Sequence, residues 1–95
     1  MIKLDAQNRI HIPKSLLSLC NTDFKSEIRL YINEDELFID NPKDDYLDIP
    51  CFGKVNLDYK YRFFPSRPVR EAFGLYADTK FAIYVKNSVI TIKKI

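Results

Sequence analysis

The chain of 95 residues is 46% hydrophobic and 29% charged, which suits one compact domain with a real core. Its two cysteines form no CxxC pair or Cys/His cluster, and no apolar run approaches the about 20 residues of a membrane span; a disulfide-rich secreted domain and a membrane-spanning helix are therefore excluded. The formal net charge is +2, but residues 1–53 carry six Lys/Arg against ten Asp/Glu, whereas residues 54–95 carry nine against three. This asymmetry indicates a nucleic-acid face on the basic half, or attraction between the halves or between copies.

The predicted elements follow the same order twice along the chain. Strands are expected near residues 2–6, 9–12, 27–33 and 36–40, with a short helix near 14–20. The proline-bearing acidic segment over residues 42–53 is typical of a linker. Strands are then expected near residues 54–59, 62–65, 80–86 and 89–94, with a helix near 67–73 that Ser66 can cap. The sequence thus predicts a mainly β fold with short helices.

These elements recur because the sequence repeats itself at a spacing of 53 residues without a gap. Apolar positions of the predicted helices and strands stay in register under this shift. Identical residues also coincide, namely Leu4 with Leu57, Asp5 with Asp58, Arg9 with Arg62, Tyr31 with Tyr84 and Ile39 with Ile92. We expect one domain over residues 1–95, in which repeat 1 (residues 1–41) and repeat 2 (residues 54–95) interleave as one pseudo-twofold β-barrel, because each repeat alone is too small to bury both of its faces.

The first strand pair of each repeat is predicted to place apolar side chains inward and charged side chains outward. The outward residues are Lys3, Asp5, Arg9 and His11 in repeat 1, and Lys54, Asp58, Lys60 and Arg62 in repeat 2, with Phe64 at the position of His11. Lys14 and Arg67 fall at matching positions at the start of each predicted helix, where the helix dipole gives a cation no advantage. The basic residues together form a quasi-symmetric stripe of the kind that follows a phosphate backbone.

This double pattern of a strand, Asp-x-x-x-Arg, an apolar run ending in proline, a basic residue, a helix and a hairpin resembles the AbrB/MraZ swapped-hairpin superfamily of DNA-binding proteins. The resemblance covers about residues 1–40 and 54–95. It implies two swapped-hairpin repeats, a homo-oligomer, and a hairpin surface whose basic side chains face DNA, most simply a double strand. The candidate DNA-binding residues are Lys3, Arg9, His11, Lys14, Lys54, Lys60, Arg62 and Arg67.

The acidic residues of the two motifs require a separate explanation, because a carboxylate repels phosphate. Asp5 and Asp58 each stand four residues before an arginine and across a turn from it. We expect them to orient Arg9 and Arg62 through charge-assisted hydrogen bonds rather than to contact DNA.

The second motif departs from the family pattern. Family members usually have glycine just before the arginine, where this chain has Asn8 and Tyr61. Because positive φ is costly for tyrosine, we expect the second turn to be altered. Phe64 either faces outward, to stack or to pack at an oligomer interface, or lies in the core if Pro65 shifts the strand register. Tyr31 and Tyr84 suit a subunit contact or a helix-covered sheet face.

No motif indicates an enzyme, a metal or a cofactor. The sequence lacks a glycine-rich phosphate loop and a GxSxG elbow, and its only histidine, His11, has no predicted metal partner or nucleophile nearby. Asp44, Asp45 and Asp48 do not have the spacing of an EF-hand and suit a solvated linker. The leading hypothesis is a cytoplasmic, nucleoid-associated transcriptional regulator that binds DNA. The alternatives are an antitoxin of the same superfamily and an oligomeric interaction module that has kept the fold and lost DNA binding.

Overall fold

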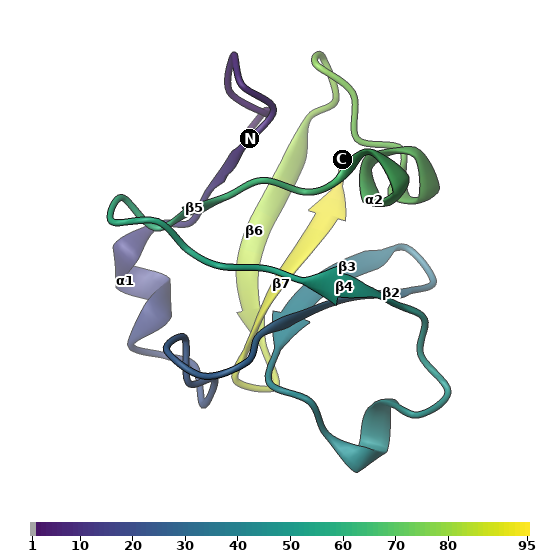
Figure 1. Ribbon diagram of the computed structural model, residues 1–95. Helices are drawn as coiled ribbons and strands as arrows, with labels where there is room; N and C mark the ends of the chain where they lie inside the picture. Colours follow the sequence, from purple (N-terminus) through teal and green to yellow (C-terminus); the bar gives the residue numbers. More distant parts are fainter. Residues whose placement is uncertain (1) are drawn as a thin grey trace.

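The computed structural model describes residues 2–95 and confirms a mainly β chain with short helices (Figure 1). Strands β1 (Ile10–His11) and β5 (Arg62–Phe63) form a two-stranded sheet. The second sheet has five strands in the order β4 (Cys51–Lys54), β2 (Arg29–Asn33), β3 (Glu36–Asp40), β7 (Val89–Lys94) and β6 (Phe81–Lys86). The helices are α1 (Lys14–Leu17) and α2 (Arg67–Phe73), and a 3-10 turn, η1, spans Asp44–Tyr46.

Two hairpins, β2–β3 and β6–β7, supply four strands of the larger sheet. Their short turns contain residues with positive φ, which is 56° at Glu34 in the first turn and 53° and 63° at Asn87 and Ser88 in the second. This conformation suits the right-handed twist of the paired strands. Successive side chains of a strand point to opposite faces, so alternate apolar residues enter the core. The fully buried ones include Leu37, Ile39, Ile90 and Ile92.

Helix α2 has the predicted bounds because its sequence carries signals at both ends. Ser66 is the N-cap residue by its extended backbone, although its side chain makes no capping hydrogen bond. Pro68 lies in the first turn where its missing N–H has no cost, and Gly74 ends the helix with φ of 80°. Val69 and Phe73, one helical turn apart, are buried. Helix α1 ends at residue 17 instead of near 20; none of its residues is fully buried, so tertiary packing supports it less.

Two strand pairs join residues that are equivalent in the sequence repeat. Ile10 lies opposite Phe63 in the β1–β5 pair, and Phe38 lies opposite Thr91 in the β3–β7 pair. Ile10 and Phe38 thus each face the residue 53 positions further along the chain, which is the equivalent residue of the other repeat. Both pairs are antiparallel, as a local twofold relation between the repeats requires.

The segments predicted as strands over residues 2–6 and 54–59 pair less than expected. A bridge joins Ile2 to Phe81, and its repeat equivalent is the hydrogen bond from the N–H of Val55 to the carbonyl of Ile28 at 3.0 Å. Each segment therefore contacts the hairpin of the other repeat. Neither segment forms the continuous strand pairing that would join the two sheets. The predicted closed barrel is accordingly not found among residues 2–95, which form two separate sheets.

Strand β4 takes in residues 51–53 of the segment that was expected to be only a linker, together with Lys54, the first residue of a predicted strand. It pairs with β2, where Arg29 faces Lys54 and Tyr31 faces Cys51 with a shift in register between them. Gly53 lies at this irregularity with φ of 111°, a conformation that favours glycine. The predicted strand over residues 54–59 is thus displaced toward the N-terminus, because the open edge of β2 offers hydrogen-bond partners to residues 51–54.

Asp40, the last residue of β3, forms hydrogen bonds and an ion pair with the segment that follows it, which includes η1. Only 1% of this residue is exposed. Its carboxylate accepts hydrogen bonds from the Thr22 hydroxyl at 3.0 Å, from the backbone N–H of Asn41 at 2.8 Å and from the hydroxyl of Tyr46, and Lys43 Nζ lies 2.8 Å from Oδ2. The charge is therefore buried with partners on all sides, as a buried carboxylate requires.

Tyr31 faces outward on β2, but an aromatic cluster covers it. Its ring lies 5.3 Å from that of Phe38 and 4.7 Å from that of Tyr46, measured between centroids, and only 3% of Tyr31 is exposed. The sheet face at this residue is therefore covered, by Phe38 of β3 and by Tyr46 of the 3-10 turn η1 rather than by an α-helix. Tyr84, its repeat equivalent, is half-buried and donates a hydrogen bond to Glu36 Oε2 at 2.8 Å.

Cutting the chain between the repeats is expected to leave both halves associated, because β1–β5 and β3–β7 each join one repeat to the other. A specific protease site placed between the exposed Asp44 and Asp45 allows such a cut. Size-exclusion chromatography in native buffer should show one species of unchanged size, and denaturing electrophoresis should show two fragments. Fragments that separate and fold as independent monomers would contradict the prediction of one domain.

Candidate nucleic-acid interface

The two Asp-x-x-x-Arg motifs form turns with the same backbone geometry. In repeat 1 the N–H of Asp5 donates to the carbonyl of Arg9 at 3.0 Å, and the N–H of Asn8 donates to the carbonyl of Asp5 at 2.9 Å. The equivalent bonds in repeat 2 measure 2.9 and 3.0 Å. Asn8 and Tyr61 both have φ of 60°. The expected alteration of the second turn is therefore wrong, since Tyr61 adopts the left-handed conformation that asparagine adopts in the first.

Asp5 is the centre of a hydrogen-bond network in the first turn. Its Oδ1 accepts the backbone N–H of Gln7 at 2.9 Å and that of Arg9 at 2.8 Å. Its Oδ2 accepts Nε of Arg9 at 2.9 Å and lies 2.9 Å from Nε2 of His11. Partial burial raises the pKa of Asp5, but the hydrogen bonds from Arg9, His11 and Gln7 outweigh it and hold that pKa well below its usual range. The carboxylate stays ionised, and the charge-assisted bond to the arginine is present as expected.

Asp58 holds the second turn in the same way. Its Oδ1 accepts the N–H groups of Lys60 at 2.9 Å and Arg62 at 3.0 Å, and its Oδ2 accepts Nε of Arg62 at 2.6 Å. Here too burial raises the pKa, and the bonds from Arg62 and Lys60 outweigh it and lower the pKa below its usual value. These bonds compensate for the unfavourable φ of Tyr61. The Arg62 side chain is 13% exposed and that of Arg9 28%, so the second arginine is the more enclosed.

Basic residues from both repeats meet around the β1–β5 pair. His11 lies directly opposite Arg62 in this pair. The loop before β5 lies beside α1 (Figure 1), and Nζ of Lys14 is 5.8 Å from the centre of the Tyr61 ring. Lys60 extends from the same loop and is exposed. Residues on β1, β5, α1 and the loops next to them are the central members of the predicted stripe. We name this region the hairpin surface and define it by Arg9, His11, Lys14, Lys60 and Arg62.

The other three predicted DNA-binding residues lie outside the hairpin surface. One is exposed, and the other two form ion pairs with glutamates. Lys3 is exposed next to the Ile2 bridge. Lys54 Nζ lies 2.8 Å from Glu27 Oε1, and Arg67 Nε lies 2.8 Å from Glu71 Oε1 one helical turn further along α2. Exposed pairs of this kind have little net strength, so both side chains remain available to an anion.

Phe64 and its neighbours follow the outward interpretation. Phe64 is 54% exposed and Pro65 is buried like its repeat equivalent Ile12, so the register does not shift. The guanidinium of Arg70 lies 5.0 Å from the centre of the Phe64 ring and donates a hydrogen bond to the carbonyl of Pro65 at 2.8 Å. Sequence reasoning missed Arg70, because its position on a helix gave no signal that it contacts the segment after β5.

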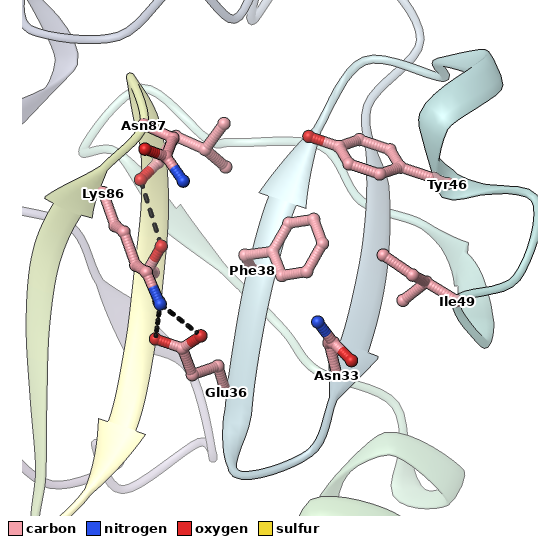
Figure 2. Close-up of a pocket in the computed structure, with 9 residues that line it drawn as sticks. Asn33, Glu36, Phe38, Tyr46, Ile49, Lys86 and Asn87 are labelled. Atoms are coloured by element: carbon pink, nitrogen blue, oxygen red, sulfur yellow. Dashed lines mark hydrogen bonds and ion pairs between the residues drawn. The ribbon is translucent and has the colours of Figure 1, made fainter.

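A hollow lies on the outer face of the larger sheet (Figure 2), with a volume of about 190 Å³. Phe38 and Tyr46 line one side of it, and Glu36 lies on the other side, 2.9 and 3.1 Å from Nζ of Lys86. The hydrogen bonds from Lys86 and Tyr84 lower the pKa of Glu36, so its charge is already matched within the chain. Across the part of the chain that the structure describes, no group of three His, Cys, Asp or Glu side chains is arranged to hold a metal.

Comparisons of the chain with protein-family models, with curated proteins and with solved structures find no match. Within residues 2–95, neither helix has the length and apolar character needed to cross a membrane.

Proposed function

We propose that the chain is a DNA-binding transcriptional regulator of the AbrB/MraZ type, and that it binds double-stranded DNA through the hairpin surface. The observation that supports this most is the pair of matching turns in which an aspartate holds an arginine beside the β1–β5 pair. Two equally built cationic turns about one strand pair suit a ligand that is itself repetitive and anionic. The phosphate backbone of duplex DNA is such a ligand.

The swapped-hairpin arrangement is part of the same proposal. It is supported by the contacts of each repeat's first segment with the hairpin of the other repeat, at Ile2 with Phe81 and at Val55 with Ile28. Homo-oligomerisation and a nucleoid-associated location stay predictions that follow from the resemblance, and a cytoplasmic location stays a prediction from the sequence.

The two alternative functions differ in their support. An altered second turn would favour an interaction module that has lost DNA binding, but the two turns share one geometry. The acidic character of residues 1–53 remains in its favour. No observation favours the antitoxin over the regulator.

Salt dependence tests the proposal. Each phosphate that is neutralised contributes about −0.9 to the slope of log affinity against log salt concentration, so about three to five contacts per chain predict a slope of roughly −3 to −5. Replacing Lys14 with alanine should flatten the slope by about 1 and weaken binding similarly for all sequences. Fluorescence anisotropy with a labelled duplex at several salt concentrations measures both quantities.

Lys93→Ala is the matched control, because Lys93 is an exposed lysine of β7 on the outer face of the larger sheet, paired at 3.4 Å with Asp35. It removes the same charge away from the hairpin surface and should leave the slope unchanged. Equal effects of Lys14→Ala and Lys93→Ala would count against this surface, and an absence of binding at low salt would end the proposal.

A further inference from the structure

The tips of the two turns differ in chemistry although their backbones match. Position 6 in the first turn is Ala6, and its repeat equivalent in the second turn is Tyr59. Tyr59 is 81% exposed. A single exposed aromatic residue is common on protein surfaces and needs no explanation by itself. What distinguishes Tyr59 is its place at the tip of a turn that carries two cations.

Both cations lie close to the ring. Nζ of Lys60 is 5.5 Å and Cζ of Arg62 is 5.8 Å from the centre of the Tyr59 ring. Proteins that hold unpaired nucleotides combine these two elements: an aromatic ring on which a base stacks, and basic side chains that contact the phosphates on either side of it. The first turn offers the cation without the ring, since Ala6 has no surface on which a base can stack.

We propose that Tyr59 is a base-stacking residue and that the second turn recognises an unpaired base within duplex DNA. This rests on the proposed function, because the two turns must bind the same DNA. The first turn then contacts regular backbone, and the second contacts a point where the stack is interrupted. Lys60 and Arg62 would lie against the phosphates that flank the unpaired base. The hairpin surface is thereby asymmetric in what it recognises, although its backbone is nearly symmetric.

Two labelled duplexes test the inference, one fully paired and one identical except for a single unpaired 2-aminopurine. The wild-type chain should bind the second duplex more tightly by roughly 5- to 150-fold, the range that stacking on one aromatic side chain supplies. It should also quench the 2-aminopurine fluorescence, which reports stacking directly. Tyr59→Ala should abolish both the preference and the quenching while keeping the affinity for the paired duplex, and Tyr59→Phe should keep all three.

Two further variants control the result. Tyr76→Ala removes another exposed tyrosine, 59% exposed in the loop between α2 and β6, and should change nothing. Ala6→Tyr in the Tyr59→Ala background moves the ring to the matching turn. It should restore only part of the preference, because Gln7 stands where the second turn has Lys60. If the wild-type chain binds both duplexes equally, or if Tyr59→Ala keeps the preference, the inference is overturned while the proposed function stands. If the wild-type chain binds neither duplex, both fail.

Discussion

Replacing Asp40 with alanine is expected to lower the free energy of unfolding by about 2–4 kcal/mol. The substitution removes an almost fully buried carboxylate, and the hydroxyls of Thr22 and Tyr46 lose the acceptor of their hydrogen bonds. It also releases Lys43, whose ammonium lies 2.8 Å from the carboxylate. Chemical denaturation followed by circular dichroism measures the change.

Asp35→Ala provides the comparison, because the Asp35 side chain is 65% exposed and its only ion pair, within residues 2–95, is the 3.4 Å contact with Lys93. This substitution should change the free energy of unfolding by no more than about 0.5 kcal/mol. Equal losses in the two variants would show that the bonds of Asp40 do not stabilise the fold.

The same carboxylate predicts how stability depends on pH. Burial raises the pKa of Asp40, but the hydrogen bonds from Lys43, Tyr46 and Thr22 outweigh it and lower the pKa below its ordinary value of 3.8. A group whose pKa is lower in the folded state stabilises the fold above its unfolded pKa, and this stabilisation is lost as the pH falls through the folded pKa. The wild-type chain should therefore lose stability below about pH 4, and Asp40→Ala should lose less over that range.

The elements that depend on local signals could be predicted from the sequence. Helix α2 follows from Ser66, Pro68 and Gly74, and the hairpins follow from the alternation of apolar residues. Strand β4 could not be predicted, because its sequence, CFGK, shows no alternation and pairs only where β2 offers an open edge. The burial of Asp40 could not be predicted either. Lys43 and Tyr46 follow it closely in the chain, but Thr22 lies 18 residues before it and only the fold brings the two together.

The site divides in the same way. The spacing of aspartate and arginine across a turn predicted their hydrogen bonds, because that geometry is local. The prediction of an altered second turn was wrong because it weighed the conformational preference of Tyr61 alone. The two bonds that Asp58 Oδ1 accepts from the backbone N–H groups of Lys60 and Arg62 hold the backbone of this turn instead. The contact of Lys14 with the second turn depends on the pairing of β1 with β5 and could not be read from either repeat.

Replacing both Asp5 and Asp58 with asparagine is expected to weaken DNA binding by roughly 5- to 150-fold, the cost of immobilising two flexible side chains on binding instead of beforehand. Asparagine keeps Oδ1 as an acceptor for the backbone N–H groups of each turn, so the turns persist. It replaces Oδ2 with an amide that cannot accept the guanidinium of Arg9 or Arg62, so the arginines lose the bonds that hold them.

The sign of the effect distinguishes orientation from simple charge. If the two aspartates were only surface acids, removing two negative charges beside the phosphates would tighten binding, most strongly at low salt. If they orient the arginines, binding weakens, and the loss is clearest at higher salt, where the gain from the removed charges is screened. Anisotropy titrations at two salt concentrations separate these outcomes. Asp23→Asn is the matched control, because Asp23 also accepts a backbone N–H two residues ahead, that of Lys25 at 3.0 Å, but lies in the loop between α1 and β2. It should leave the affinity unchanged, and tighter binding by the double variant would refute the positioning role.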